Sequence, residues 1–135
     1  MTQRKRSELS ECEDDVLCGV NLAENDDPAE MSALEKKHVP VIAAPDSVKE
    51  GECFQVTVEV GKYKDHPNET DHFIDFVELY ADHTYLGRAH FRPVTTCPTV
   101  TFCVQLEHIH QKLRAFEHCN RHGTWESDHE ITVTE

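Results

Sequence analysis

The chain has 135 residues and a formal net charge of −13, from 26 acidic and 13 basic side chains. This length favours one domain with a two-layer core, and so acidic a chain is a poor partner for nucleic acid or an anionic membrane surface. No apolar run approaches the roughly 20 residues of a membrane span, and the basic start Met1–Arg6 lacks the apolar segment of a secretory signal. We therefore expect a soluble cytoplasmic protein.

Residues 1–31 are polar and acidic, with few aromatic side chains. The run Asn25-Asp26-Asp27-Pro28 is typical of a turn or linker, and a short helix is predicted around Ala29 to Lys37. We interpret residues 1–31 as an irregular or partly helical acidic extension. Residues 32–135 would then form the single folded domain.

From Val39 onward the pattern predicts short strands. Apolar residues alternate with polar ones in several stretches, as in strands with one buried face. Pro40 predicts a sheet edge for the first strand, whereas Phe73–Ala81 is apolar on both faces and is expected to be central. Seven strands at this spacing favour an all-β antiparallel sandwich. The predicted strands are 39–42, 54–60, 73–81, 85–91, 100–106, 112–118 and 130–134.

Histidine and cysteine are the residues that suggest chemistry, with ten and six copies respectively. Cys119 and His122 have a spacing found among metal ligands, in a tight loop that Gly123 would permit and Trp125 would hold. His66 and His72 share a polar loop between two predicted strands, and His38 lies upstream. A lone histidine is usually a solvated or hydrogen-bonded side chain, but the joint pattern favours one metal site.

The number of candidate ligands bears on the choice of metal. Structural zinc sites are nearly always closed and four-coordinate, so four imidazoles and one thiolate argue against zinc. An octahedral ion held by these five groups would keep one open position opposite an electron-rich thiolate. Such a position suits a small oxygen ligand, and iron is the expected metal.

Three segments, 37–42, 66–74 and 119–125, resemble in order the signature segments of superoxide reductases, the family of neelaredoxins and of the iron-binding domain of desulfoferrodoxins. The resemblance spans roughly residues 35 to 135. It implies an immunoglobulin-like seven-stranded sandwich and the one-electron reduction of superoxide to hydrogen peroxide. It also implies one Fe(2+)/Fe(3+) ion per chain, with axial Cys119 and four equatorial histidines: His38, His66, His72 and His122.

The resemblance further implies a cation beside the open iron position, and Lys37 matches the lysine of the family. Its charge would draw in the superoxide anion, although a solvated surface lysine is the simpler interpretation. The family glutamate that closes the ferric site is replaced here by Lys36, which would add a second attracting charge. Glu35, one residue further away, would reach the iron only with a shifted loop.

By the same resemblance we expect a rubredoxin-like electron donor and a homo-oligomer, with a tetramer as the form among single-iron relatives. A second iron centre is expected to be absent, because Cys12 and Cys18 are only two of the four cysteines it needs. No role is predicted for Cys53, Cys97 or Cys103. Two other functions stay open at this point: a non-catalytic iron or electron-transfer module on the same fold, and a structural zinc domain.

Overall fold

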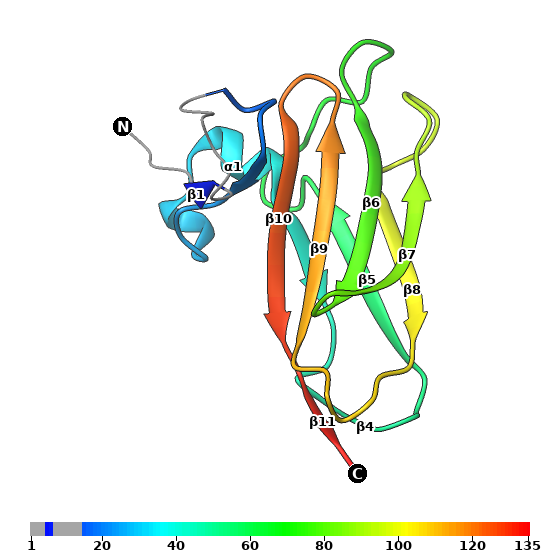
Figure 1. The fold of residues 1–135 in the computed structure, drawn as a ribbon. Coiled ribbons are helices and arrows are strands. Elements are labelled where there is room, and N and C mark those ends of the chain that lie inside the picture. The colour runs from blue at the N-terminus through cyan, green and yellow to red at the C-terminus, as the bar shows by residue number, and fades with distance from the viewer. Residues whose placement is uncertain (1–4, 7–14) are drawn as a thin grey trace.

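The structure is a computed structural model that describes residues 5–6 and 15–135. Two β-sheets pack face to face, and the extension lies beside one end of the sandwich (Figure 1). The larger sheet has the strand order β1-β2-β10-β9-β6-β7, the second has β3-β5-β8, and β11 pairs with β4 in a small third sheet. The elements are β1 Lys5–Arg6, β2 Val20–Leu22, η1 Pro28–Glu30, α1 Ala33–His38, β3 Pro40–Ala43, β4 Ser47–Lys49, β5 Phe54–Val60, β6 Ile74–Ala81, β7 Thr84–His90, β8 Thr99–Val104, β9 Lys112–Cys119, β10 Gly123–Glu130 and β11 Thr132–Thr134.

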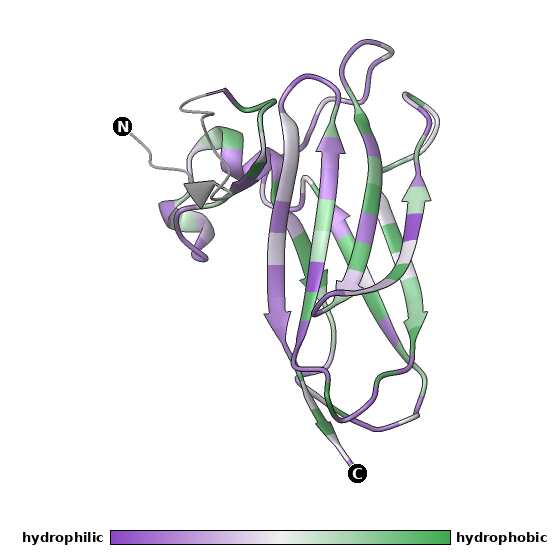
Figure 2. Ribbon diagram, in the orientation of Figure 1, coloured by the Kyte–Doolittle hydropathy of each residue, from purple (hydrophilic) through white to green (hydrophobic). Residues whose placement is uncertain are grey.

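The core lies between the two larger sheets. Along β5 and β9 every second residue is buried, as expected for strands with one face against the core. Val56 and Val58 of β5 meet Leu79 of β6 and Leu113 of β9 in one apolar cluster. Figure 2 shows the same alternation of apolar and polar residues along these strands. The cluster gives the sandwich a rigid body on which loops at one end hold functional side chains.

The predicted all-β sandwich is confirmed. Most strands begin and end within two residues of their predicted limits, including β5 at 54–60 and β9 at 112–119. Pro40 lies in β3, at the edge of its sheet, and the predicted central strand is β6, between β9 and β7. The periodicity of apolar residues was therefore sufficient to identify these strands.

Four of the described strands were not predicted, namely β1, β2, β4 and β10, and the largest of them is β10, Gly123–Glu130. Its segment is mostly polar, because one face points to solvent and the core face presents few apolar side chains beyond Trp125, so no alternation is visible. The short strands β2 and β4 also went unpredicted. Each pairs in parallel, β2 with β10 and β4 with β11, which departs from the expectation of a purely antiparallel sandwich.

The single predicted helix is split into η1 and α1. Ser32 forms a capping box with Glu35: its hydroxyl accepts from the backbone N–H of Glu35, whose carboxylate accepts from the N–H of Ser32. This cap starts α1 anew at Ala33, and α1 ends at His38. In the described part of the chain, no helix has the length and apolar character needed to cross a membrane.

Candidate metal centre

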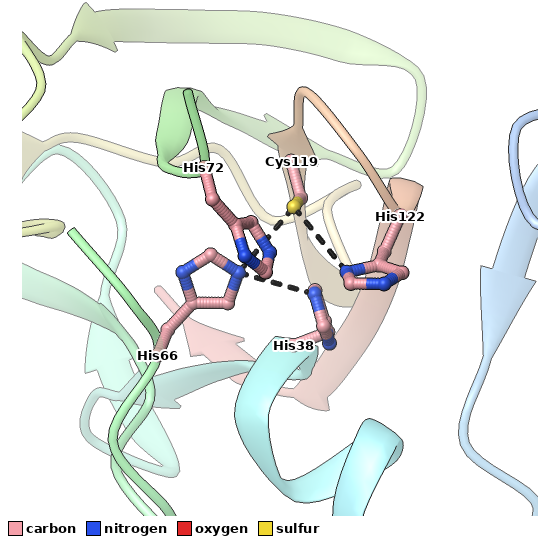
Figure 3. A group of neighbouring side chains, drawn as sticks. All are labelled: His38, His66, His72, Cys119 and His122. Carbon is pink, nitrogen blue, oxygen red and sulfur yellow. Dashed lines mark hydrogen bonds between the residues drawn. The ribbon is translucent and has the colours of Figure 1, made fainter. Parts of the chain in front are cut away.

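Five side chains from four segments converge at one end of the sandwich (Figure 3). One donor atom of each lies within 4.8 Å of a donor atom of every other member. The α1 helix ends with His38, β9 ends with Cys119, and His122 stands in the turn before β10. His66 and His72 come from the loop between β5 and β6. The group consists of His38, His66, His72, Cys119 and His122, all five of the predicted ligands.

Hydrogen bonds set the orientation of two of the rings. His38 Nδ1 lies 2.7 Å from the carbonyl oxygen of Leu34, and His66 Nδ1 lies 2.6 Å from that of Pro67. A carbonyl only accepts, so each Nδ1 carries the proton and each Nε2 presents a lone pair. The two Nε2 atoms are 3.1 Å apart. Two lone pairs at this distance repel unless a cation lies between them, which is the arrangement of a metal site.

The other donors complete the same cluster. Cys119 Sγ lies 3.3 Å from His66 Nε2 and 3.8 Å from Nδ1 of His122. The Nε2 atom of His72 is buried and has no hydrogen-bond partner among the described residues. A buried nitrogen without a partner is costly and normally has an explanation. Four imidazoles and one sulfur are compatible with an iron ion, which binds both ligand types.

The protonation states agree with this interpretation. Burial lowers the pKa of His38 to about 3 and that of His66 to about 4, so both rings are neutral near pH 7. Burial raises the pKa of the Cys119 thiol, and the backbone N–H groups of Arg121 and His122 partly offset this effect. Neutral imidazoles are ready to bind a metal, and a bound ion would drive the thiol to the thiolate.

Comparison with known proteins identifies the family. The desulfoferrodoxin family model matches residues 30–128, which include all five side chains of the group. The chain belongs to the desulfoferrodoxin family. A superoxide reductase of Pyrococcus furiosus is 36% identical over 111 residues, covering 69% of this chain and 86% of the relative.

Solved structures of this family have the same fold. The crystal structure of a putative superoxide reductase from Thermotoga maritima matches with a TM-score of 0.71 and 36% identity, covering 86% of this chain and 95% of the other. A superoxide reductase (neelaredoxin) from Ignicoccus hospitalis matches with a TM-score of 0.67 and 41% identity, covering 78% and 89%. The family resemblance predicted from the three segments is confirmed.

In this member of the desulfoferrodoxin family, the β9–β10 turn is braced against the His66–His72 loop. The side-chain amide of Asn120 accepts from the N–H of Phe73 at 2.8 Å and donates to the carbonyl of Asp71 at 2.9 Å. The guanidinium of Arg121 donates to the same carbonyl and to the Asp71 carboxylate, both at 3.1 Å. These contacts align the two ligand-bearing segments. Sequence reasoning missed them, although Asn120 and Arg121 lie within the predicted ligand loop.

Trp125 contacts two of the candidate ligands. It is fully buried, and its indole N–H donates to the carbonyl of His122 at 3.0 Å. Its ring stacks on His38, with the centroids 5.3 Å apart and the planes 22° from parallel. The predicted role of Trp125 in holding the Cys119 loop agrees with these contacts, and the stacking on His38 adds to it.

The three other predicted site residues lie in α1. Lys36 and Lys37 are half-buried. Burial lowers the pKa of His66 most, followed by the neighbouring histidines, and the charge of Lys37 lowers it further. The Lys37 ammonium therefore lies near the five-residue group. Glu35 is buried and is not a member of the five-residue group. Its two carboxylate oxygens accept from the backbone N–H groups of Ser32 and Glu24.

Glu117 is a further buried polar residue, two positions before Cys119. Its carboxyl oxygens have no hydrogen-bond partner in the described structure, and burial raises its pKa well above the usual value. The pattern of β9 places this side chain on the core face, where burial favours the neutral form of the acid. Sequence reasoning did not single it out, since an acidic residue at a core position is indistinguishable from a surface one without the register.

The other cysteines within residues 15–135 are not part of the group. Cys53, Cys97 and Cys103 are exposed and free. Cys97 precedes β8, whereas Cys103 is within it. Cys18 is disulfide-bonded, and Cys12 lies outside the described residues.

Proposed function

We propose that the protein is a superoxide reductase. It reduces one superoxide anion by one electron, with uptake of two protons, to one hydrogen peroxide, and it evolves no oxygen. The observation that carries this proposal is the convergence of four imidazoles and one cysteine sulfur from four chain segments. Structural zinc sites have four ligands, so a five-donor group favours an open redox site over a closed structural one.

One iron ion per chain would be held by His38, His66, His72, His122 and Cys119. When bound, iron supplies the one-electron couple between its ferrous and ferric states. The four imidazoles and the Cys119 thiolate would be the ligands of this iron, and the thiolate would donate electron density to it. The backbone N–H groups of Arg121 and His122 hydrogen-bond to the Cys119 sulfur and stabilise its negative charge.

Lys37 is the proposed attracting group for superoxide. Its ammonium lies near enough to His66, His72 and His122 to lower the pKa of each, beside the larger effect of burial. In a chain of net charge −13, a local cation is needed to offset long-range repulsion of an anion. Lys36 would add a second, weaker attraction. We assign Glu35 to the cap of α1, since binding iron would break its bonds to Ser32 and Glu24.

The proposal includes a rubredoxin-like electron donor and a homo-oligomer, as for relatives with a single iron. A cytoplasmic location is part of it: the exposed free thiols of Cys53, Cys97 and Cys103 fit a reducing compartment, whereas the disulfide of Cys18 does not. Residues 32–135 would form the iron-binding domain and residues 1–31 its extension, of which β2 pairs with β10.

Stopped-flow kinetics with a superoxide pulse tests the activity. Iron-loaded, reduced protein should consume superoxide and yield about one peroxide per iron oxidised, with no oxygen released. Stoichiometric oxygen release would identify a dismutase instead. Absence of a fast reaction would identify an electron-transfer module on the same fold.

The Cys119→Ser variant tests the ligand assignment within the same experiment. It should lose the thiolate-to-iron absorption of the oxidised protein, because a serine hydroxyl has no comparable charge-transfer transition. Cys103→Ser, at an exposed free cysteine of β8, is the matched control and should keep the band. A band that survives in Cys119→Ser would remove Cys119 from the ligand set.

A further inference from the structure

The extension packs directly onto the turn that carries Cys119 and His122. The backbone of Val16 lies over Gly123, and a Cβ added to Gly123 would stand 1.9 Å from the Val16 carbonyl oxygen. Gly123 also has a φ of +84°, which favours glycine. Two independent constraints therefore require glycine here. The contact with Val16 shows that residues far apart in the sequence meet at the end of the ligand turn.

Asn21 is the side chain that joins these two segments. It is fully buried, and its amide nitrogen donates to the carbonyl of Val16 at 2.9 Å and to that of Thr124 at 3.0 Å. One bond closes the turn at Val16 within the extension, and the other crosses to β10. Both amide hydrogens are used, so an apolar or smaller side chain would leave two partly buried carbonyls without this donor.

The strand pairing extends this contact toward the ligands. Asn21 is the register partner of Trp125 in the parallel β2–β10 pair. Trp125 in turn donates to the carbonyl of His122 and stacks on the ring of His38. Asn21 is thus connected to His122 and His38 through the β2–β10 strand pair and the buried indole of Trp125.

The extension also contacts α1, the helix that carries another candidate ligand. The backbone N–H of Glu24 donates to the carboxylate of Glu35 in α1, the helix that ends at His38. Residues 16–38 therefore form a strap that contacts the ligand turn at its start and supplies His38 at its end. The contacts at both ends fix the position of His38 relative to Cys119 and His122.

We propose that Asn21 is a positioning residue of the metal centre. By holding Val16–Leu22 against β10, it keeps the ligand turn and the His38 ring in the arrangement that binds the ion. A site that is ordered before binding loses less conformational entropy on binding, and so holds the metal more tightly. The inference rests on the proposed metal centre but not on its reaction with superoxide.

Cobalt binding to the metal-free full chain tests this inference. Co²⁺ bound to Cys119 gives a thiolate-to-cobalt absorption, and release into excess EDTA gives a dissociation rate. Asn21→Ala should weaken the affinity about tenfold or more, speed the release, and shift the band, as losses of supporting hydrogen bonds around metal ligands do. Asn21→Ser, which retains one donor, should fall between Asn21→Ala and the wild type. The samples are kept free of thiol reductant to preserve the disulfide of Cys18.

Two controls separate positioning from general stability. Asn25→Ala changes the same residue type at an exposed position of the extension and should match the wild type. Val56→Ala removes buried methyl groups from β5 and should lower the thermal midpoint without changing the affinity or the band. If Asn21→Ala lowers only the thermal midpoint, as Val56→Ala does, the inference is overturned. If the wild type shows no thiolate band with Co²⁺, the metal centre itself is wrong, and the inference fails with it.

Discussion

At the scale of single residues, Lys37 carries the charge that we propose attracts superoxide. Burial is the largest cause of the low pKa of His72 and His122, and the ammonium of Lys37 adds to it. The same ammonium also lowers the pKa of His66, so its charge acts on three of the four candidate histidine ligands. Lys36 precedes it in α1, and successive helical residues point in different directions. The two lysines are a natural pair for comparison.

Lys37→Ala should slow the reaction of the reduced iron protein with superoxide about tenfold, because a local cation raises the encounter rate of an anion. Iron content and affinity should not change, since Lys37 is not a proposed ligand. Lys36→Ala is the matched control, with a smaller effect. Pulse radiolysis at low and high salt measures both rates. Equal rates for Lys37→Ala and the wild type would remove Lys37 from the mechanism.

At the scale of elements, the centre depends on the contact between the β9–β10 turn and the loop before β6. The side chain of Asn120 forms two hydrogen bonds across this contact, and Arg121 adds a hydrogen bond to the Asp71 carbonyl and an ion pair with the Asp71 carboxylate. That ion pair is largely exposed and contributes little by itself. The bonds of Asn120 are also exposed, but its one side-chain amide both accepts from and donates to the facing segment, so it joins the two ligand-bearing segments at two points.

Asn120→Ala should reduce the affinity for Co²⁺ about tenfold and lower the free energy of unfolding by about 1–2 kcal/mol, at about 1 kcal/mol for each lost bond. Gln105→Ala removes one exposed amide contact, to the carbonyl of Gly51, away from the site. It should leave the metal affinity unchanged. Titration with Co²⁺ and urea denaturation measure the two quantities. An unchanged affinity in Asn120→Ala would mean that the two segments align without this brace.

At the scale of the whole molecule, the buried histidines link stability to pH. The folded, metal-free protein keeps His38 neutral down to a pKa of about 3 and His66 down to about 4, whereas both titrate near 6.5 when unfolded. Below about pH 6.5 the unfolded chain thus binds more protons than the folded one. These groups stabilise the fold fully above pH 6.5, and their contribution is lost as the pH falls toward 4 and then 3.

Urea denaturation of the metal-free protein should therefore give a nearly constant free energy of unfolding between about pH 7 and 8. It should fall below about pH 6.5, by up to about 1.4 kcal/mol per pH unit for one such histidine. His38→Gln should flatten the curve. His108→Gln is the control and should not flatten the curve. His108 is exposed, and its hydrogen bond to Glu50 raises its pKa, so its effect on stability is weak and of opposite sign. A curve that is flat down to about pH 5 would contradict the proposed neutral core histidines.

The sequence was most informative where the signal is local. Alternation identified β5 and β9 because each strand buries every second residue along its own length. It failed for β10, whose inward positions hold few apolar residues. Alternation could not predict the pairing of β2 with β10 either, because a strand of three residues carries no periodicity.

By itself, the sequence determined the family, the class of fold and the five side chains able to bind a metal, since these depend on residue types and short spacings. Only the tertiary structure decided which ring nitrogen of His38 and His66 faces the centre, that Glu35 caps α1, and that Asn21 bonds to the strand after the ligand turn. The physical reason is the range of the contacts. Asn21 and Thr124 are 103 positions apart, and a hydrogen bond between them exists only once both sheets and the extension have packed.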